Sequence, residues 1–163
     1  MNRSVKRWFC SGLFLMVLLS GCISEATPAA QIAPAEIDFE VIAAGAPPVG
    51  QGSEPLTLAV RGDDTTRAVP ASLPDEARSA FEALLADADP SLYLVIYGGV
   101  QPSSGYAVVI ESITRVEGRV TVTYRVTGPG PDEGAATVMT HPYVIIRLTE
   151  ATFAPDAVVF ERQ

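Results

Sequence analysis

Side chains that could do nucleophilic or acid–base chemistry are few and scattered in this sequence. His141 is the only imidazole. A Ser-His-Asp triad would also need an exposed serine, and the sequence has no Gly-x-Ser-x-Gly turn. Two carboxylate pairs, Asp63-Asp64 and Asp132-Glu133, stand beside glycine, which is typical of solvated turn residues rather than of acid–base or calcium sites. With two cysteines and one histidine, a structural zinc site is not expected either. We therefore predict a protein that is not an enzyme and that holds no metal or cofactor.

Cys22 is a candidate site of covalent modification. A basic start with Arg3, Lys6 and Arg7 precedes an apolar run over residues 8–19. As a helix, this run would span roughly 18 Å, too short for the hydrocarbon core but suited to a signal peptide. It ends in Leu-Ser-Gly-Cys22, which resembles the lipobox of bacterial lipoproteins. The resemblance implies cleavage of the signal peptide 1–21 and thioether lipidation, with palmitate-type acylation, of Cys22. The alternatives are an ordinary secretory signal and an uncleaved anchor.

The charge balance limits the partners. The chain has 19 acidic and 11 basic residues, for a formal net charge of −8. Loss of residues 1–21 would leave eight basic residues against 19 acidic ones, a charge of −11. A chain with this net charge lacks the basic surface of a nucleic-acid-binding protein and is repelled by anionic lipids. We expect no nucleic-acid partner, and attachment to the outer face of the cell membrane through acyl chains alone.

The mature chain divides into a tether and one domain. Residues 22–36 are small, proline-containing and without a sustained apolar period, which predicts a flexible tether. Residues 37–163 fit a single domain in length and composition. Because Cys10 would leave with the signal peptide and Cys22 would be acylated, this domain must be stable without a disulfide.

Hydrophobic periodicity predicts one helix and several strands in this domain. The helix follows Ser72, a candidate cap, has Pro74 in its first turn and ends before Pro90; its apolar positions recur at helical spacing. Strands are predicted at 38–42, 56–60, 92–97, 106–113, 120–126, 136–139, 143–148 and 157–160, with 92–97 buried on both faces. A tight turn at 116–118 joins two of them. The fold class is therefore α+β: a mainly antiparallel sheet with one amphipathic helix packed on a face.

A family resemblance rests on three motifs in fixed order. These are Gly99-Val-Gln-Pro-Ser-Ser-Gly-Tyr106 opening a strand, a proline-rich loop at 129–131, and Thr140-His-Pro-Tyr143 opening the last strand of the motif. Together they resemble the PrcB C-terminal domain family over residues 93–148. The chain departs at Ser103-Ser104, where the family usually has Thr-Gly, and inserts Asp132-Glu133 in the loop. The resemblance implies a lipoprotein that assists or stabilises a partner, in particular an exported protease, and it implies no catalytic residues.

The motif residues suggest where a partner would bind. Gly105 would present Tyr106 at the start of its strand, and Pro142 would kink the chain at Tyr143. The candidate partner-binding residues are these two tyrosines, whose rings lose little entropy on binding, with Gly105 and Pro131 of the proline-rich loop. The alternative is that the glycine, proline and tyrosine residues of the motifs are determinants of the fold, with the rings in the core. Three roles stay open: a lipid-anchored accessory or binding protein for an exported protease or another envelope protein, a protease inhibitor presenting the 128–134 loop, and a structural envelope lipoprotein.

Overall fold

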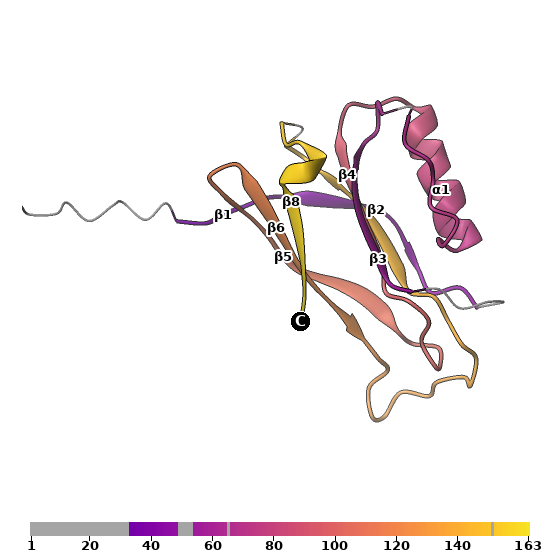
Figure 1. Cartoon of the computed structure of the whole chain (residues 1–163). Helices are drawn as coiled ribbons and strands as arrows, with labels where there is room; N and C mark the ends of the chain where they lie inside the picture. Colours follow the sequence, from indigo (N-terminus) through magenta and orange to yellow (C-terminus); the bar gives the residue numbers. More distant parts are fainter. Residues whose placement is uncertain (1–32, 49–53, 65, 151) are drawn as a thin grey trace, which may run out of the picture. The chain divides into compact units, whose positions relative to one another are not determined.

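The computed structural model describes residues 33–48, 54–64, 66–150 and 152–163. The predicted signal peptide and Cys22 lie outside these residues. The described chain forms two four-stranded sheets, with strand orders β1-β5-β6-β8 and β2-β7-β4-β3. One helix covers the outer face of the second sheet, so the domain has three layers (Figure 1). The predicted α+β class, mainly antiparallel with a single helix, is confirmed, but the strands divide between two sheets.

The element bounds follow the predicted pattern closely. They are β1 Ala35–Glu36, β2 Phe39–Gly45, β3 Leu56–Arg61, α1 Asp75–Ala86, β4 Leu92–Tyr97, β5 Ala107–Val116, β6 Arg119–Thr127, β7 Tyr143–Leu148, the short 3-10 turn η1 Pro155–Ala157 and β8 Val158–Arg162. All strand pairs are antiparallel except β6–β8. No helix of the described part is both long and apolar enough to cross a membrane.

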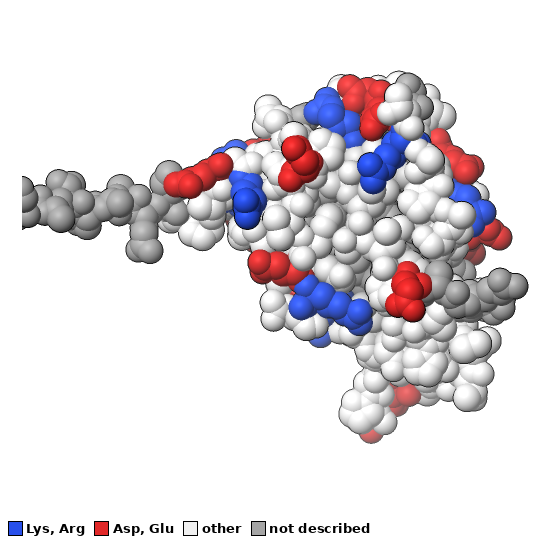
Figure 2. Space-filling view, in the orientation of Figure 1, with Lys and Arg blue, Asp and Glu red and all other residues white. Residues whose placement is uncertain are grey.

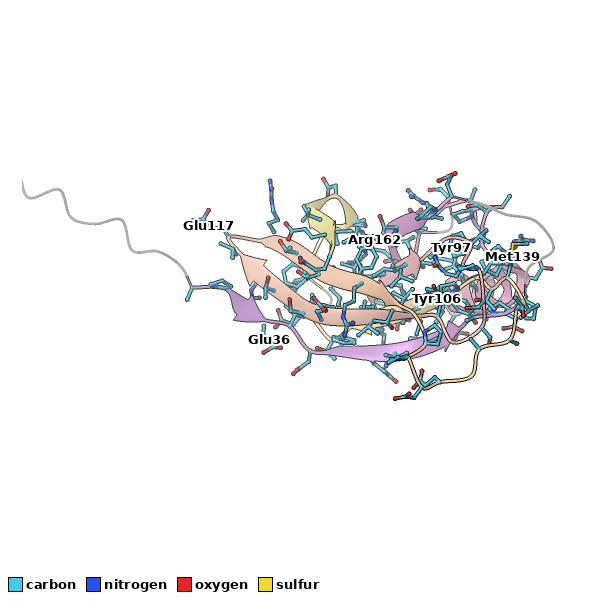
Figure 3. The ribbon with its side chains drawn as sticks, turned by 90° about the horizontal axis from the view of Figure 1, so that it is seen from below. Glu36, Tyr97, Tyr106, Glu117, Met139 and Arg162 are labelled. Atoms are coloured by element: carbon cyan, nitrogen blue, oxygen red, sulfur yellow. The ribbon has the colours of Figure 1, made fainter. Side chains whose placement is uncertain are left out.

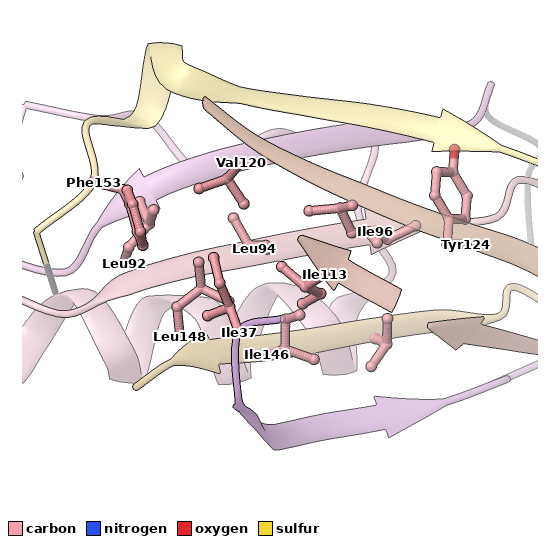
Figure 4. Close-up of a cluster of buried hydrophobic side chains, with 12 residues drawn as sticks. Ile37, Leu92, Leu94, Ile96, Ile113, Val120, Tyr124, Ile146, Leu148 and Phe153 are labelled. Atoms are coloured by element: carbon pink, nitrogen blue, oxygen red, sulfur yellow. The ribbon is translucent and has the colours of Figure 1, made fainter. Parts of the chain in front are cut away.

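The central strand β4 explains the three layers. All six of its side chains are buried, as the unbroken apolar sequence predicts. Leu92, Leu94 and Ile96 face the first sheet, where they meet side chains from β5 and β6; side chains from β7, the neighbour of β4 in its own sheet, belong to the same cluster (Figure 4). Tyr93, Val95 and Tyr97 alternate with them and face the helix. Because strand side chains alternate in direction, one strand supplies both cores.

The helix begins later than Ser72 predicts. Pro74 is the N-cap, with a ψ of 150°, and the helix begins at Asp75. Leu73 turns back onto Pro70 through a backbone hydrogen bond of 3.1 Å and buries its side chain, so the chain cannot start a helix at Ser72. At the other end α1 stops at Ala86, before Pro90. The prediction that Ser72 caps the helix is wrong.

Residues 136–139, predicted as a strand, form none. The backbone N–H of Val138 donates to the carbonyl of Ala136 at 2.8 Å, which turns the chain out of any ladder. The next residue, Thr140, makes isolated bridges to Pro48 and Gln101.

At the other end of the domain, the last two residues of the predicted tether belong to the first sheet. Ala35 and Glu36 form β1 and pair with Arg115 and Thr114 of β5.

Candidate functional site

Two long connections lie at the same end of the two-sheet domain. Residues 98–106 join β4 to β5, and residues 128–142 join β6 to β7. The register pairs Ala107 with Thr127 and Tyr97 with Tyr143, so both connections leave from the same end of their strands. We call these two segments together the loop end. In Figure 3 the labelled Tyr106 and Met139 lie at this end, whereas Glu36 and Glu117 lie at the other.

Backbone and side-chain hydrogen bonds hold the two loops together. Ser104 and Ala136 exchange two of them: the N–H of Ser104 donates to the carbonyl of Ala136 at 3.0 Å, and the N–H of Ala136 donates to the Ser104 hydroxyl at 2.8 Å. Gln101 and Thr140 exchange two backbone hydrogen bonds of 2.8 and 3.0 Å. The Thr140 hydroxyl donates to the carbonyl of Ser103 at 2.8 Å. The longer loop is therefore fixed to the shorter one at two points.

Gly105 and Tyr106 are packed directly against the start of the longer loop. Gly105 has a φ of +86°, and a Cβ placed there would lie 3.0 Å from the Cβ of Pro129. A Cβ on Gly128 would lie 3.0 Å from the ring of Tyr106. The ring of Tyr106 thus lies against a glycine and remains half-buried. Both the positive φ and the close approach require glycine, because any side chain would be strained or would clash.

The longer loop is exposed along most of its length. Residues 131–139, which include Pro131, are all exposed. The carboxylate of Glu133 accepts a hydrogen bond from the N–H of Gly130 at 2.9 Å, and the Glu133 N–H donates to the Gly130 carbonyl at 3.0 Å, which closes a turn. Farther along, Val138 and Met139 are 42% and 54% exposed. Of the candidate residues, the loop end therefore brings together Gly105, Tyr106 and Pro131.

Tyr143 lies elsewhere. Its ring is 6% exposed, belongs to the cluster between the second sheet and the helix, and lies against Gly45. Burial, helped by the charge of Glu76, raises the pKa of the Tyr143 phenol. The side chain has little surface left for a partner, as the alternative of a core ring predicts.

His141 is a buried residue of the longer loop. It is 6% exposed, its Nδ1 shares a hydrogen bond with the Tyr97 hydroxyl, and the two rings stack with centroids 5.4 Å apart. Its own N–H donates to the carbonyl of Pro47 at 3.0 Å. Sequence reasoning did not find this pair because the two residues are 44 positions apart.

The carboxylate pairs also have local partners. Asp63 forms a 3.1 Å ion pair with Arg61. Asp64 accepts hydrogen bonds from the hydroxyl and the N–H of Thr66, which lower the pKa of the Asp64 carboxyl. Within the described ranges, no three histidine, cysteine or acidic side chains gather as a metal site would require.

Three residues of the loop end were missed from the sequence. Val138 and Met139 fell in a predicted strand, and Ser104 was noticed only as a departure from a motif. The apolar pair between Thr137 and Thr140 looks like part of a buried strand, and its exposure depends on the pairing of Ala136 with Ser104. No local signal in the sequence reveals that pairing.

The comparisons agree with the motifs. Residues 92–149 match the family model described as PrcB C-terminal, 58 of the 163 residues. The matched segment runs from β4 to the end of β7 and contains both connections of the loop end. No curated protein and no solved structure matches the chain.

Proposed function

We propose, from the premise that residues 92–149 belong to the PrcB C-terminal family, that this chain is a lipid-anchored binding protein of the cell envelope. Its partner is a component of an exported protease complex, and its role is to assist or stabilise that partner rather than to catalyse a reaction. Acylation of Cys22 holds it on the outer face of the membrane. The single observation that carries the binding role is the loop end: an exposed loop that internal hydrogen bonds hold in place.

The position of the loop end supports this role. The described chain begins at Ala33 and reaches β1, which pairs with Arg115 and Thr114 near the β5–β6 turn. That turn is Glu117-Gly118, at the far end of β5 from the loop end. Ten residues of β5 span about 33 Å. The loop end therefore lies at the opposite end of β5 from Ala35 and Glu36, where the described chain begins, and this leaves the loop end accessible to a partner.

The fixed conformation of the two loops also supports the binding role. Ordering a loop on binding costs free energy, and a loop that is already held avoids part of that cost. Tyr106 is a half-buried aromatic residue beside the exposed loop. Tyrosine is a frequent interface anchor because its ring offers a large contact area at small entropic cost.

Crosslinking of the intact lipoprotein in cells tests the proposal. We expect one specific protein adduct that Tyr106→Ala removes and that Val116→Ala, an exposed position in β5 far from the loops, leaves in place. Urea denaturation of both variants separates loss of binding from loss of fold. The binding role fails if Tyr106→Ala remains folded and the adduct persists.

The lipid anchor is tested separately. Cys22→Ser should release the protein from membranes or leave it unprocessed, and normal lipidation of that variant would refute the anchor.

Inhibition of a protease is a second candidate function. It is favoured by one observation, the continuous exposure of residues 131–139 in a loop that is fixed at Ala136 and Thr140. The 128–134 segment contains the Gly130–Glu133 turn, and residues 136–138 contain a second turn, so an inhibitor of this kind would present a turned rather than an extended segment. An assay against several exported proteases tests it. Inhibition with an intact loop supports the idea, and rapid cleavage without inhibition contradicts it.

A further inference from the structure

We infer that Val138 and Met139, which we call the apolar tip, are the anchor of the loop end, and that they insert into an apolar pocket bordered by Lys or Arg on a folded protein partner. This inference rests on the proposed binding function and names the residues and the partner chemistry. Among the described residues of the two loops, Val138 and Met139 are the large apolar side chains that are exposed, at 42% and 54% respectively.

The backbone on both sides of the apolar tip is fixed. On one side Ala136 is tied to Ser104 by two hydrogen bonds, and on the other Thr140 is tied to Gln101 by two more. The N–H of Val138 donates to the carbonyl of Ala136, which also accepts from Ser104. Two apolar side chains are thus held outward on a short, pinned stretch. Such preorganisation lowers the entropic cost of binding, and methionine adapts well to an apolar pocket.

The charge of the loop end indicates the border of that pocket. Residues 98–110 contain no charged side chain, and residues 126–146 contain only Asp132 and Glu133, both exposed, beside the buried His141. In Figure 2 the lowest part of the view, where these loops lie, shows red but no blue. A partner that contacts the apolar tip would therefore meet two carboxylates on the same loop, while Arg162 and Glu54 lie together beside Gly98–Gln101 of the shorter loop. Complementary Lys or Arg on the partner would speed encounter and favour the correct orientation.

The same observations argue against two other occupants. The membrane is disfavoured because the exposed carboxylates of Asp132 and Glu133 are repelled by anionic lipids. A second copy is disfavoured because a symmetric contact would bring Asp132 and Glu133 of both copies together, and neither of the two loops has a basic residue of its own to pair with them. A folded protein of complementary charge is the occupant that the surface fits.

Photo-crosslinking from a neighbouring position tests the inference. The full lipoprotein carries benzoylphenylalanine in place of Thr137, an exposed residue, and is irradiated in cells. We expect an adduct with another protein whose yield falls roughly tenfold or more in the Val138→Ser/Met139→Ser variant, as for loss of an interface hot spot. The matched control is Val41→Ser on β2, since Val41 is 54% exposed as Met139 is. It should leave the yield unchanged. Asp132→Lys should lower the yield, and the crosslinked peptide should map beside an apolar pocket with Lys or Arg.

Other outcomes overturn the inference in distinguishable ways. An adduct that persists in the double serine variant, while Tyr106→Ala removes it, would refute the apolar tip and leave the proposed function standing. An adduct with lipid or with a second copy would refute the stated partner. If benzoylphenylalanine gives no protein adduct from position 137, and none when it is placed at position 106 instead, the inference and the proposed function both fail. Because both tip residues are exposed, the double serine variant should keep the denaturation midpoint of the parent, and this is checked in parallel.

Discussion

Ser104 and Ala136, 32 residues apart in the chain, are joined by two reciprocal hydrogen bonds, one to the Ala136 carbonyl and one to the Ser104 hydroxyl. A glycine at position 104 could still donate its N–H, but it could not accept from Ala136. Ser104 thus gives this chain an additional constraint on its longer loop.

Ser104→Ala should loosen that loop without unfolding the domain. The variant leaves the exposed N–H of Ala136 to water, so the cost in unfolding free energy should be about 1 kcal/mol or less. Amide exchange at Ala136 and Val138, and proteolysis within 131–139, should become faster. The control is Ser103→Ala, because the Ser103 hydroxyl contacts only the adjacent carbonyl of Ser104, at 3.3 Å. Equal exchange rates in the two variants would contradict the constraint.

Gly105→Ala should destabilise the domain more than Gly118→Ala. Both glycines have φ values near +80°, a conformation that costs an alanine about 1–2 kcal/mol. A Cβ on Gly118 meets nothing within 4 Å, whereas a Cβ on Gly105 meets Pro129 at 3.0 Å. The difference between their urea midpoints measures the packing of the two loops. Equal midpoints would show that the contact between position 105 and Pro129 does not contribute to the stability of the domain.

Leu94→Ala should destabilise the core between the two sheets. Leu94 is fully buried there, and removing its side chain leaves a cavity, with an expected loss of about 3 kcal/mol in unfolding free energy. Urea denaturation monitored by circular dichroism measures the loss. Val159→Ala in β8, where the side chain is 36% exposed, serves as control and should change stability by less than about 0.5 kcal/mol. A loss at position 94 as small as the control's would contradict the described core.

Stability should fall in acid through Asp89. Hydrogen bonds from the hydroxyls of Tyr93 and Ser91 lower the pKa of the Asp89 carboxyl below its ordinary value. Because the folded pKa lies below the unfolded one, this contribution is complete above about pH 4 and is lost as the pH falls through the folded pKa.

Urea midpoints measured between about pH 7 and about pH 2.5 test this dependence. Asp89→Asn should have a flatter profile than the parent at the acidic end. Asp87→Asn, at the nearby exposed end of the helix, should keep the parent's slope. A profile for Asp89→Asn as steep as the parent's would show that other groups cause the acid sensitivity.

The sequence was most informative where burial sets a simple period. The run 92–97 and the segment 120–126 predicted β4 and most of β6 correctly, and Tyr143–Leu148 was predicted residue by residue. The Val116–Arg119 pairing confirms the predicted tight turn, with positive φ at Glu117 and Gly118. In each case neighbouring residues alone determine the structure.

The parts that were missed depend on contacts between distant residues. A period of two in one strand does not say which strands share a sheet, so the division into two sheets was not predicted. Ser104 pairs with Ala136, close to Met139, and Tyr97 pairs with His141, and both pairs join residues that are far apart in the sequence. The sequence therefore predicted Gly105 and Tyr106 as candidate residues but did not predict the apolar tip.

The most direct measurement of the central claim compares the two ends of the domain. Benzoylphenylalanine is placed in the lipid-anchored protein either at position 106, at the loop end, or at position 117, at the β5–β6 turn near β1, and each variant is irradiated in cells. The account predicts a specific protein adduct from position 106 and none from position 117. A protein adduct from position 117 with none from position 106 would contradict it.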